Sequence, residues 1–98
     1  MPKYFMLWEV DPSAMPADPK ERGALWIGMT EIVKQQIKDG ITKDWGCFVG
    51  ETNGYSVSEQ SELDLAKEIQ QFYPLVTFKV HQVMSIDDIA EVSKSMMG

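Results

Sequence analysis

The residues best suited to acid–base chemistry are the single histidine and two charged residues that could lie near it. His81 is the only histidine in the chain, and an imidazole can take up or release a proton near neutral pH. Glu9 ends an otherwise apolar segment, where burial would raise its pKa and let it exchange a proton with His81. Lys79 lies two residues before His81 and could hold an anion. A plainer interpretation places all three side chains in solvent, as is usual for charged residues.

Aromatic residues are a second set of candidates. Trp8, Trp45 and Tyr55 could line a pocket for a planar organic ligand, or they could simply pack in the core or at an interface. Trp26 falls within a helical apolar stripe, so we expect it to pack in the core. Cys47 has apolar neighbours and is expected to be a buried, inert thiol. One histidine and one cysteine do not make a metal site, and no glycine-rich phosphate loop is present. We therefore expect no metal and no cofactor.

The elements that must position these residues begin with a strand at Lys3–Val10. Tyr4, Met6, Trp8 and Val10 fall on one face of this strand, while Phe5 and Leu7 fall on the other. Apolar residues on both faces predict a strand that is covered on both sides.

The rest of the chain predicts an α+β fold. We expect helices over residues 19–39, 62–73 and 86–96, and strands over 44–50, 55–59 and 75–84, with Asn53-Gly54 as a hairpin turn. Asp18, Ser61 and Ser85 are each followed three residues later by an acidic residue, which is typical of helix N-caps. The order is β-α-β-β-α-β with an added C-terminal helix, a ferredoxin-like arrangement. It forms a single domain over residues 1–98.

In this arrangement both main helices lie on one face of the sheet. The chain has only one short helix left for the other face, so a second copy of the same sheet is the economical cover. We therefore predict a homodimer.

Composition excludes several classes of partner. The 98 residues carry 9 basic and 15 acidic side chains, a net charge of −6, which disfavours binding to nucleic acid or to anionic lipid. No segment approaches the length of about 20 apolar residues that spans a bilayer, and the N-terminus does not look like a secretory signal. We expect a soluble cytoplasmic protein that binds neither nucleic acid nor membrane.

Three short segments resemble one family. They are Met15-Pro16-Ala17-Asp18, the segment GETNGYSVSEQ at 50–60, and Phe72-Tyr73-Pro74-Leu75 with the strand after it. These segments resemble, respectively, the entry to the first helix, the Gly-Glu turn, and the end of the second helix in muconolactone isomerases and their relatives in the dimeric α+β barrel superfamily. The resemblance implies a dimer whose two sheets close into a barrel with the helices outside.

The resemblance does not carry the isomerase activity with it. The segment Trp45–Val49 contains no Arg or His where the isomerases have a basic strand, and an amphipathic helix replaces their His-Pro tail. A lactone isomerase needs a cation to hold the carboxylate and a base to move a proton. A relative of the isomerases is therefore the better match.

Three functions remain open at this stage. The first is a protein that binds a small apolar or aromatic organic acid. The second is a cofactor-free isomerase or oxygenase in which His81 and Glu9 handle the proton and Lys79 holds the anion. The third is a structural or interaction domain whose core is filled by its own side chains.

Overall fold

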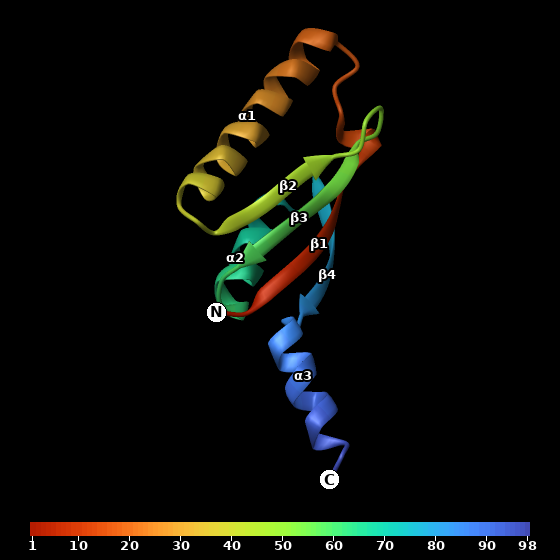
Figure 1. The fold of residues 1–98 in the computed structure, drawn as a ribbon. Coiled ribbons are helices and arrows are strands. Elements are labelled where there is room, and N and C mark those ends of the chain that lie inside the picture. Colours follow the sequence, from red (N-terminus) through yellow and green to blue (C-terminus); the bar gives the residue numbers. More distant parts are fainter.

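A computed structural model describes all residues, 1–98. It contains a four-stranded antiparallel sheet in the order β2-β3-β1-β4 and three α-helices (Figure 1). The elements are β1 (Lys3–Val10), a 3₁₀ turn η1 (Pro12–Ala14), α1 (Pro19–Lys38), β2 (Thr42–Cys47), β3 (Asn53–Glu59), α2 (Glu62–Phe72), β4 (Val76–Val83) and α3 (Ile86–Ser95). The α+β class and the order of the elements agree with the sequence prediction. No helix is long and apolar enough to cross a membrane.

The helices begin where the capping residues predict. The Asp18 carboxylate accepts a hydrogen bond from the backbone N–H three residues later, at 3.3 Å. The Ser61 and Ser85 hydroxyls each accept the equivalent bond at 3.1 Å. α1 is followed by Gly40, whose φ of +77° is the left-handed conformation expected at a helix end. Local sequence therefore fixes both ends of α1 and the starts of α2 and α3.

The hairpin between β2 and β3 differs from its predicted form. The sequence predicts a turn at Asn53-Gly54, but both residues lie in β3 and the chain reverses over residues 48–52. Gly50 takes the left-handed conformation in this loop, with φ of +77°. Gly54 instead allows close packing, because an added Cβ would lie 2.6 Å from Cζ2 of Trp8. The prediction was wrong because a glycine can be required for either reason, a tight turn or close packing against an indole, and the sequence does not distinguish the two.

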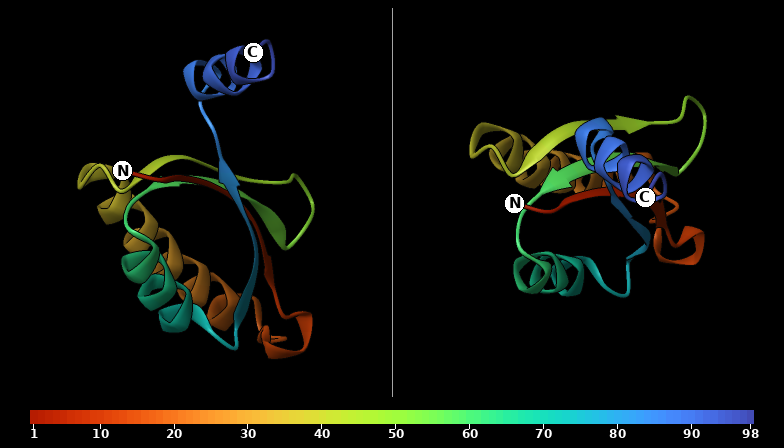
Figure 2. Two further views of the ribbon diagram at one scale, coloured as in Figure 1. Left: turned by 90° about the horizontal axis from the view of Figure 1, so that it is seen from below. Right: turned by 60° about the horizontal axis from the view of Figure 1, so that its bottom comes forward.

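The two faces of the sheet have different surroundings. α1 and α2 lie together on one face, while α3 projects on the other side (Figure 2). The face toward α1 and α2 holds the core, where Tyr4, Met6, Trp8 and Val10 are all buried. Each of these four residues was predicted to share a face, and the alternation along β1 confirms it.

The side of α2 that faces the core was predicted correctly only in part. The sequence pattern predicts that Leu63, Ala66, Ile69 and Phe72 form the apolar side. Ile69 and Phe72 pack against the core, but Leu63 is 65% exposed and Ala66 is also exposed. Leu65 is the buried residue of α2, with Ile69 packed beside it. The helix is rotated from its predicted orientation so that Glu68, rather than Ala66, lies toward the sheet.

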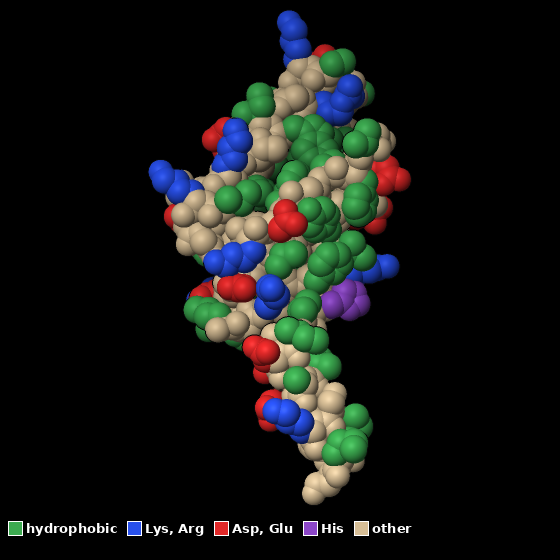
Figure 3. Space-filling view, viewed as in Figure 1, with side chains coloured by type: hydrophobic (Ala, Val, Ile, Leu, Met, Phe, Trp, Pro, Cys, Tyr) green, Lys and Arg blue, Asp and Glu red, His purple; other side chains and the backbone are tan.

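The opposite face of the sheet, which we call the open face, is uncovered within the chain. Phe5, Leu7, Tyr55 and Val57 lie on it, and Leu7 is 37% exposed. In Figure 3, which has the orientation of Figure 1, hydrophobic side chains form a band over β3 and β1 that continues toward α3. No element of the same chain packs on this face, which is the face that the sequence prediction assigns to a second copy.

Candidate functional site

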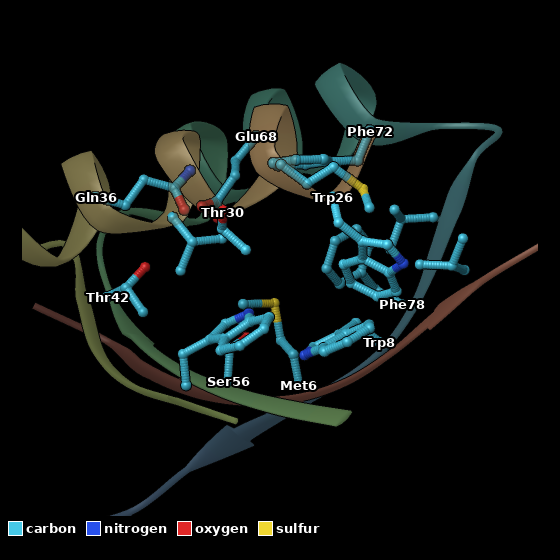
Figure 4. A pocket seen from close by; sticks show the side chains of 15 residues that line it. Met6, Trp8, Trp26, Thr30, Gln36, Thr42, Ser56, Glu68, Phe72 and Phe78 are labelled. Atoms are coloured by element: carbon cyan, nitrogen blue, oxygen red, sulfur yellow. The ribbon is translucent and has the colours of Figure 1, made fainter. Parts of the chain in front are cut away.

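The candidate site is the space between α1 and the helix-facing side of the sheet (Figure 4). None of the 20 residues of α1 is fully buried, so this helix rests across the sheet with a gap beneath it. The gap contains a cavity of about 50 Å³, lined by 15 residues of which 10 are hydrophobic. Its lining comes from α1, α2 and all four strands.

Three tryptophans form the aromatic end of this cavity. The rings of Trp8 and Trp45 are stacked, with centroids 5.2 Å apart and planes at 10°. Trp26 of α1 meets Trp8 edge-on at 6.3 Å. The Trp8 indole N–H donates a hydrogen bond to the backbone oxygen of Tyr55 at 3.1 Å, which fixes the orientation of its ring. This arrangement presents flat apolar surfaces from both the sheet and the helix.

The other end of the cavity is polar. Glu68 of α2 points into the space together with Gln36, Thr30 and Thr42 (Figure 4). The amide nitrogen of Gln60 donates a hydrogen bond to the Glu68 carboxyl at 2.8 Å. These side chains give an apolar cavity a small number of hydrogen-bonding groups, as ligand sites usually have.

The protonation of Glu68 is shifted by its surroundings. Burial raises the pKa of its carboxyl, and hydrogen bonds from Gln60 and Gln36 lower it only in part. A protonated carboxyl can donate a hydrogen bond, whereas an ionised one only accepts. Glu68 is the only ionisable side chain that lines the cavity, so it sets the proton chemistry available there.

A second, more open space adjoins the cavity, and we call it the outer depression. It has a volume of about 600 Å³ and shares Trp26, Thr30 and Trp45 with the cavity. The two spaces therefore adjoin at these side chains of α1 and β2. The depression lies within the range of about 300–1,000 Å³ that is usual for ligand pockets.

Arg22 is the cation of the outer depression. Its Nη1 atom donates hydrogen bonds to the backbone oxygens of Pro16 and Ala17, at 3.3 and 3.2 Å. These bonds hold the guanidinium at the start of α1 and leave its other N–H groups available for an anion.

The residues of α1 that line the cavity and the outer depression differ in chemical type from one end of the site to the other. Arg22, Trp26 and Thr30 are spaced four residues apart and Gln36 follows on the same side. At 1.5 Å per residue, Arg22 and Gln36 are about 21 Å apart along the helix. The site thus has Arg22 and the carboxylate of Glu51 at its mouth, aromatic walls in the middle, and Glu68 with Gln36 at its inner end.

The structure divides the sequence-predicted site residues between the two faces of the sheet. Trp8 and Trp45 line the cavity. Glu9, Lys79 and His81 lie on the open face, are exposed, and do not reach the cavity. The aromatic candidates and the charged candidates therefore do not form one site within a chain.

The three charged candidates follow one another along the strands. Glu9 is opposite Thr77 in the β1–β4 pairing, and His81 is four residues further along β4, about 13 Å at the rise of a strand. Glu9 and His81 do not contact each other within the chain. Glu9 and Lys79 are closer and border one shallow depression on the open face.

Tyr55 also lies on the open face. Its hydroxyl donates a hydrogen bond of 2.9 Å to the Asp44 carboxylate, and its ring stacks on Phe5 with centroids 6.2 Å apart. The hydrogen bond to Asp44, followed by desolvation and the charge of Asp44, raises the pKa of Tyr55. This side chain holds β2 and β3 together on the outer side of the sheet.

Sequence reasoning missed Arg22 and Glu68. The signal for Glu68 is a carboxylate inside the ridge formed by Leu65, Ile69 and Phe72, at helical spacing. The signal for Arg22 is its position one turn before Trp26. Cys47 was also predicted incorrectly: it is exposed, because β2 is an edge strand that ends at this residue.

The chain matches no family model. It also has no significant match among curated proteins. No group of three or more His, Cys, Asp or Glu side chains is arranged to hold a metal ion.

Proposed function

We propose that this protein binds a small aromatic or apolar organic acid in the site between α1 and the sheet. The observation that carries the proposal is the series of Arg22, the three tryptophans and Glu68 along two adjoining spaces that share Trp26, Thr30 and Trp45. A carboxylate would pair with Arg22, and the ring would lie against Trp26 and Trp45. The cavity of about 50 Å³ is smaller than the roughly 150 Å³ that accommodates benzene in a protein core. The ring therefore occupies the outer depression, or it enters further only if a tryptophan rotates.

The proposal includes the assembly. We assign the fold as ferredoxin-like and propose a homodimer in which two sheets stack through their open faces as a dimeric α+β barrel. Phe5, Leu7 and Val57 on the open face supply the apolar contact, which in water favours burial. This assembly is what the resemblance to muconolactone isomerases implies, and it accounts for a first strand that is apolar on both sides. We place the protein in the cytoplasm.

Titration with benzoate and its neutral analogue benzamide, followed by tryptophan fluorescence, tests ligand binding. We expect saturable binding of benzoate. Arg22→Gln should weaken it by about two- to fivefold, the effect of losing an exposed ion pair, without changing the affinity for benzamide. Lys34→Gln removes the same charge from the solvent-exposed side of α1 and should change neither.

If benzoate does not bind saturably to the natural protein, the proposal is wrong and the tryptophans only pack the core. An equal loss of benzoate affinity in the Arg22 and Lys34 variants would show that general charge, and not the site, attracts the anion.

Light scattering tests the dimer. We expect twice the mass of one chain for the natural protein, and one chain for Leu7→Glu. The added carboxylate would have to lose its water within the apolar contact, and that desolvation costs free energy even beside Lys79, which lies opposite position 7. Leu63→Glu makes the same change on the outer side of α2 and should remain dimeric. A monomeric natural protein contradicts the proposed assembly.

A proton-transfer enzyme is a second candidate, favoured by the raised pKa of Glu68 inside the cavity. The proton-handling group would then be Glu68, which lines only the inner cavity, so a substrate reaches it only when a tryptophan rotates to open that cavity. His81, Glu9 and Lys79 lie on the face that the dimer covers. Incubation with an unsaturated γ-lactone bearing a carboxylate, in deuterated water, would reveal such activity as deuterium in the lactone by NMR. Glu68→Gln should abolish this exchange and retain benzoate binding. No exchange with the natural protein rules out this candidate for that substrate class.

A further inference from the structure

The C-terminal helix α3 has no partner within its own chain. Every residue from His81 to Gly98 is exposed, and α3 stands away from the rest of the molecule (Figure 1). Its apolar side consists of Ile86, Ile89, Val92 and Met96, with exposures of 81%, 45%, 45% and 75%. These four residues recur at helical spacing and form one stripe.

A helix of this length is not stable alone. α3 has 10 residues, whereas isolated helices shorter than about 12–15 residues are marginal in water. The Ser85 cap and Asp87 and Asp88 in the first turn help its start, but they do not bury its apolar stripe. The stripe therefore requires a surface outside the chain.

The position of α3 indicates which surface this is. α3 projects on the side of the open face, opposite α1 and α2 (Figure 2). Val83 and Met84, which connect the sheet to α3, are 39% and 51% exposed. Val83 lies on the open face at the end of β4, beyond Lys79 and His81. The apolar residues of the open face and the stripe of α3 are therefore on one side of the molecule, and one partner can cover both.

The area of the open face supports the same conclusion. Four strands of six to eight residues have a flat footprint of roughly 24 by 19 Å, or about 450 Å². A stable interface usually buries about 800 Å² on each partner. The sheet alone falls short of this area, and an apolar helix that continues from it supplies the remainder.

We infer that α3 packs against a second copy of the chain and extends the interface beyond the end of the sheet. This inference rests on the proposed homodimer. In the dimer, each copy contributes one α3 to its partner, because a two-fold axis repeats every contact.

Sedimentation of α3 variants tests the inference. Ile89→Glu and Val92→Glu should each weaken the dimer at least about tenfold, since each places a charge in a buried stripe. Lys94→Gln changes the net charge by the same amount on the polar side of α3 and should leave the dimer unchanged. Because no residue of α3 is buried in its own chain, none of these changes should unfold the sheet and the other helices.

Hydrogen exchange provides a second measurement. Amides of α3 should be protected in the dimer and lose their protection in the Leu7→Glu variant. If the natural protein is a monomer, the proposed dimer is wrong and the inference about α3 fails with it. If the protein is a dimer, unchanged affinity in both stripe variants together with unprotected α3 amides overturns the inference and leaves the sheet interface standing.

Discussion

Gly54 is the position at which the smallest substitution should disturb the site most. It lies on β3 directly opposite Trp8. A Cβ at this position would lie 2.6 Å from Cζ2 of Trp8 and 2.9 Å from Cα of Cys47, and would collide with the backbone oxygen of Gly46. Two of these three neighbours are backbone atoms of β2, which cannot move away as the end of a flexible side chain can. Gly54→Ala must therefore displace the Trp8 indole or separate β2 from β3.

The expected size of the effect follows from these contacts. Overpacking of a well-packed site costs about 1–3 kcal/mol, offset by up to about 1 kcal/mol because alanine restricts the unfolded chain. We expect the free energy of unfolding to fall by about 1–2 kcal/mol. Gly28→Ala is the matched control: no atom lies within 4 Å of its added Cβ, and it is inside α1. That change should raise the free energy of unfolding by about 0.5–1 kcal/mol.

Urea unfolding followed by tryptophan fluorescence measures both variants, at one fixed protein concentration because a dimer's stability depends on it. With a urea slope of about 1–2 kcal/mol per molar, the two midpoints should move in opposite directions by roughly 1 M and 0.5 M. Near-ultraviolet circular dichroism should also change in Gly54→Ala, because Trp8 is stacked on Trp45. Equal stability of Gly54→Ala and the natural protein, with an unchanged tryptophan spectrum, would refute the close packing on which this reasoning depends.

Two further predictions concern protonation. Since burial raises the pKa of Glu68, the fold favours its protonated form, and the stability this gives is present at acidic pH and is lost as pH rises through the raised pKa. Because glutamine does not ionise, the free energy of unfolding of Glu68→Gln should increase relative to that of the natural protein as pH rises from acidic to neutral. A difference in free energy between the two proteins that stays constant with pH contradicts this. The phenol of Tyr55 should titrate above its ordinary pKa, because it donates a hydrogen bond to Asp44. Asp44→Asn should lower that pKa in an ultraviolet absorbance titration, and an unchanged titration would show that the hydrogen bond is absent in solution.

Local sequence determined most of the secondary structure. Lys3–Val10 was predicted as a strand with its exact bounds, and the caps at Asp18, Ser61 and Ser85 start their helices as expected. These features depend on neighbouring residues only: alternation of apolar side chains sets the faces of a strand, and a side-chain oxygen accepts the N–H groups that a helix start leaves free.

The candidate site depended on contacts between distant parts of the chain. Trp8 and Trp45 could be proposed as aromatic walls because their type favours such a role. Their rings stack because β3 pairs with both β1 and β2 and so brings the two residues together. No local sequence pattern shows this pairing. Glu68 enters the cavity because α2 is rotated by packing of Leu65, and sequence periodicity allowed more than one apolar side.

The sequence by itself determined a chain of alternating strands and helices, an acidic surface and a first strand that is apolar on both faces. Only the tertiary structure decided that Glu9, Lys79 and His81 lie on one side of the sheet while Arg22, the tryptophans and Glu68 lie on the other. The physical reason is that strand register and helix rotation are set by the packing of side chains far apart in the sequence. The type of a residue limits the chemistry that its side chain can perform. The long-range contacts decide which other side chains lie close enough to take part.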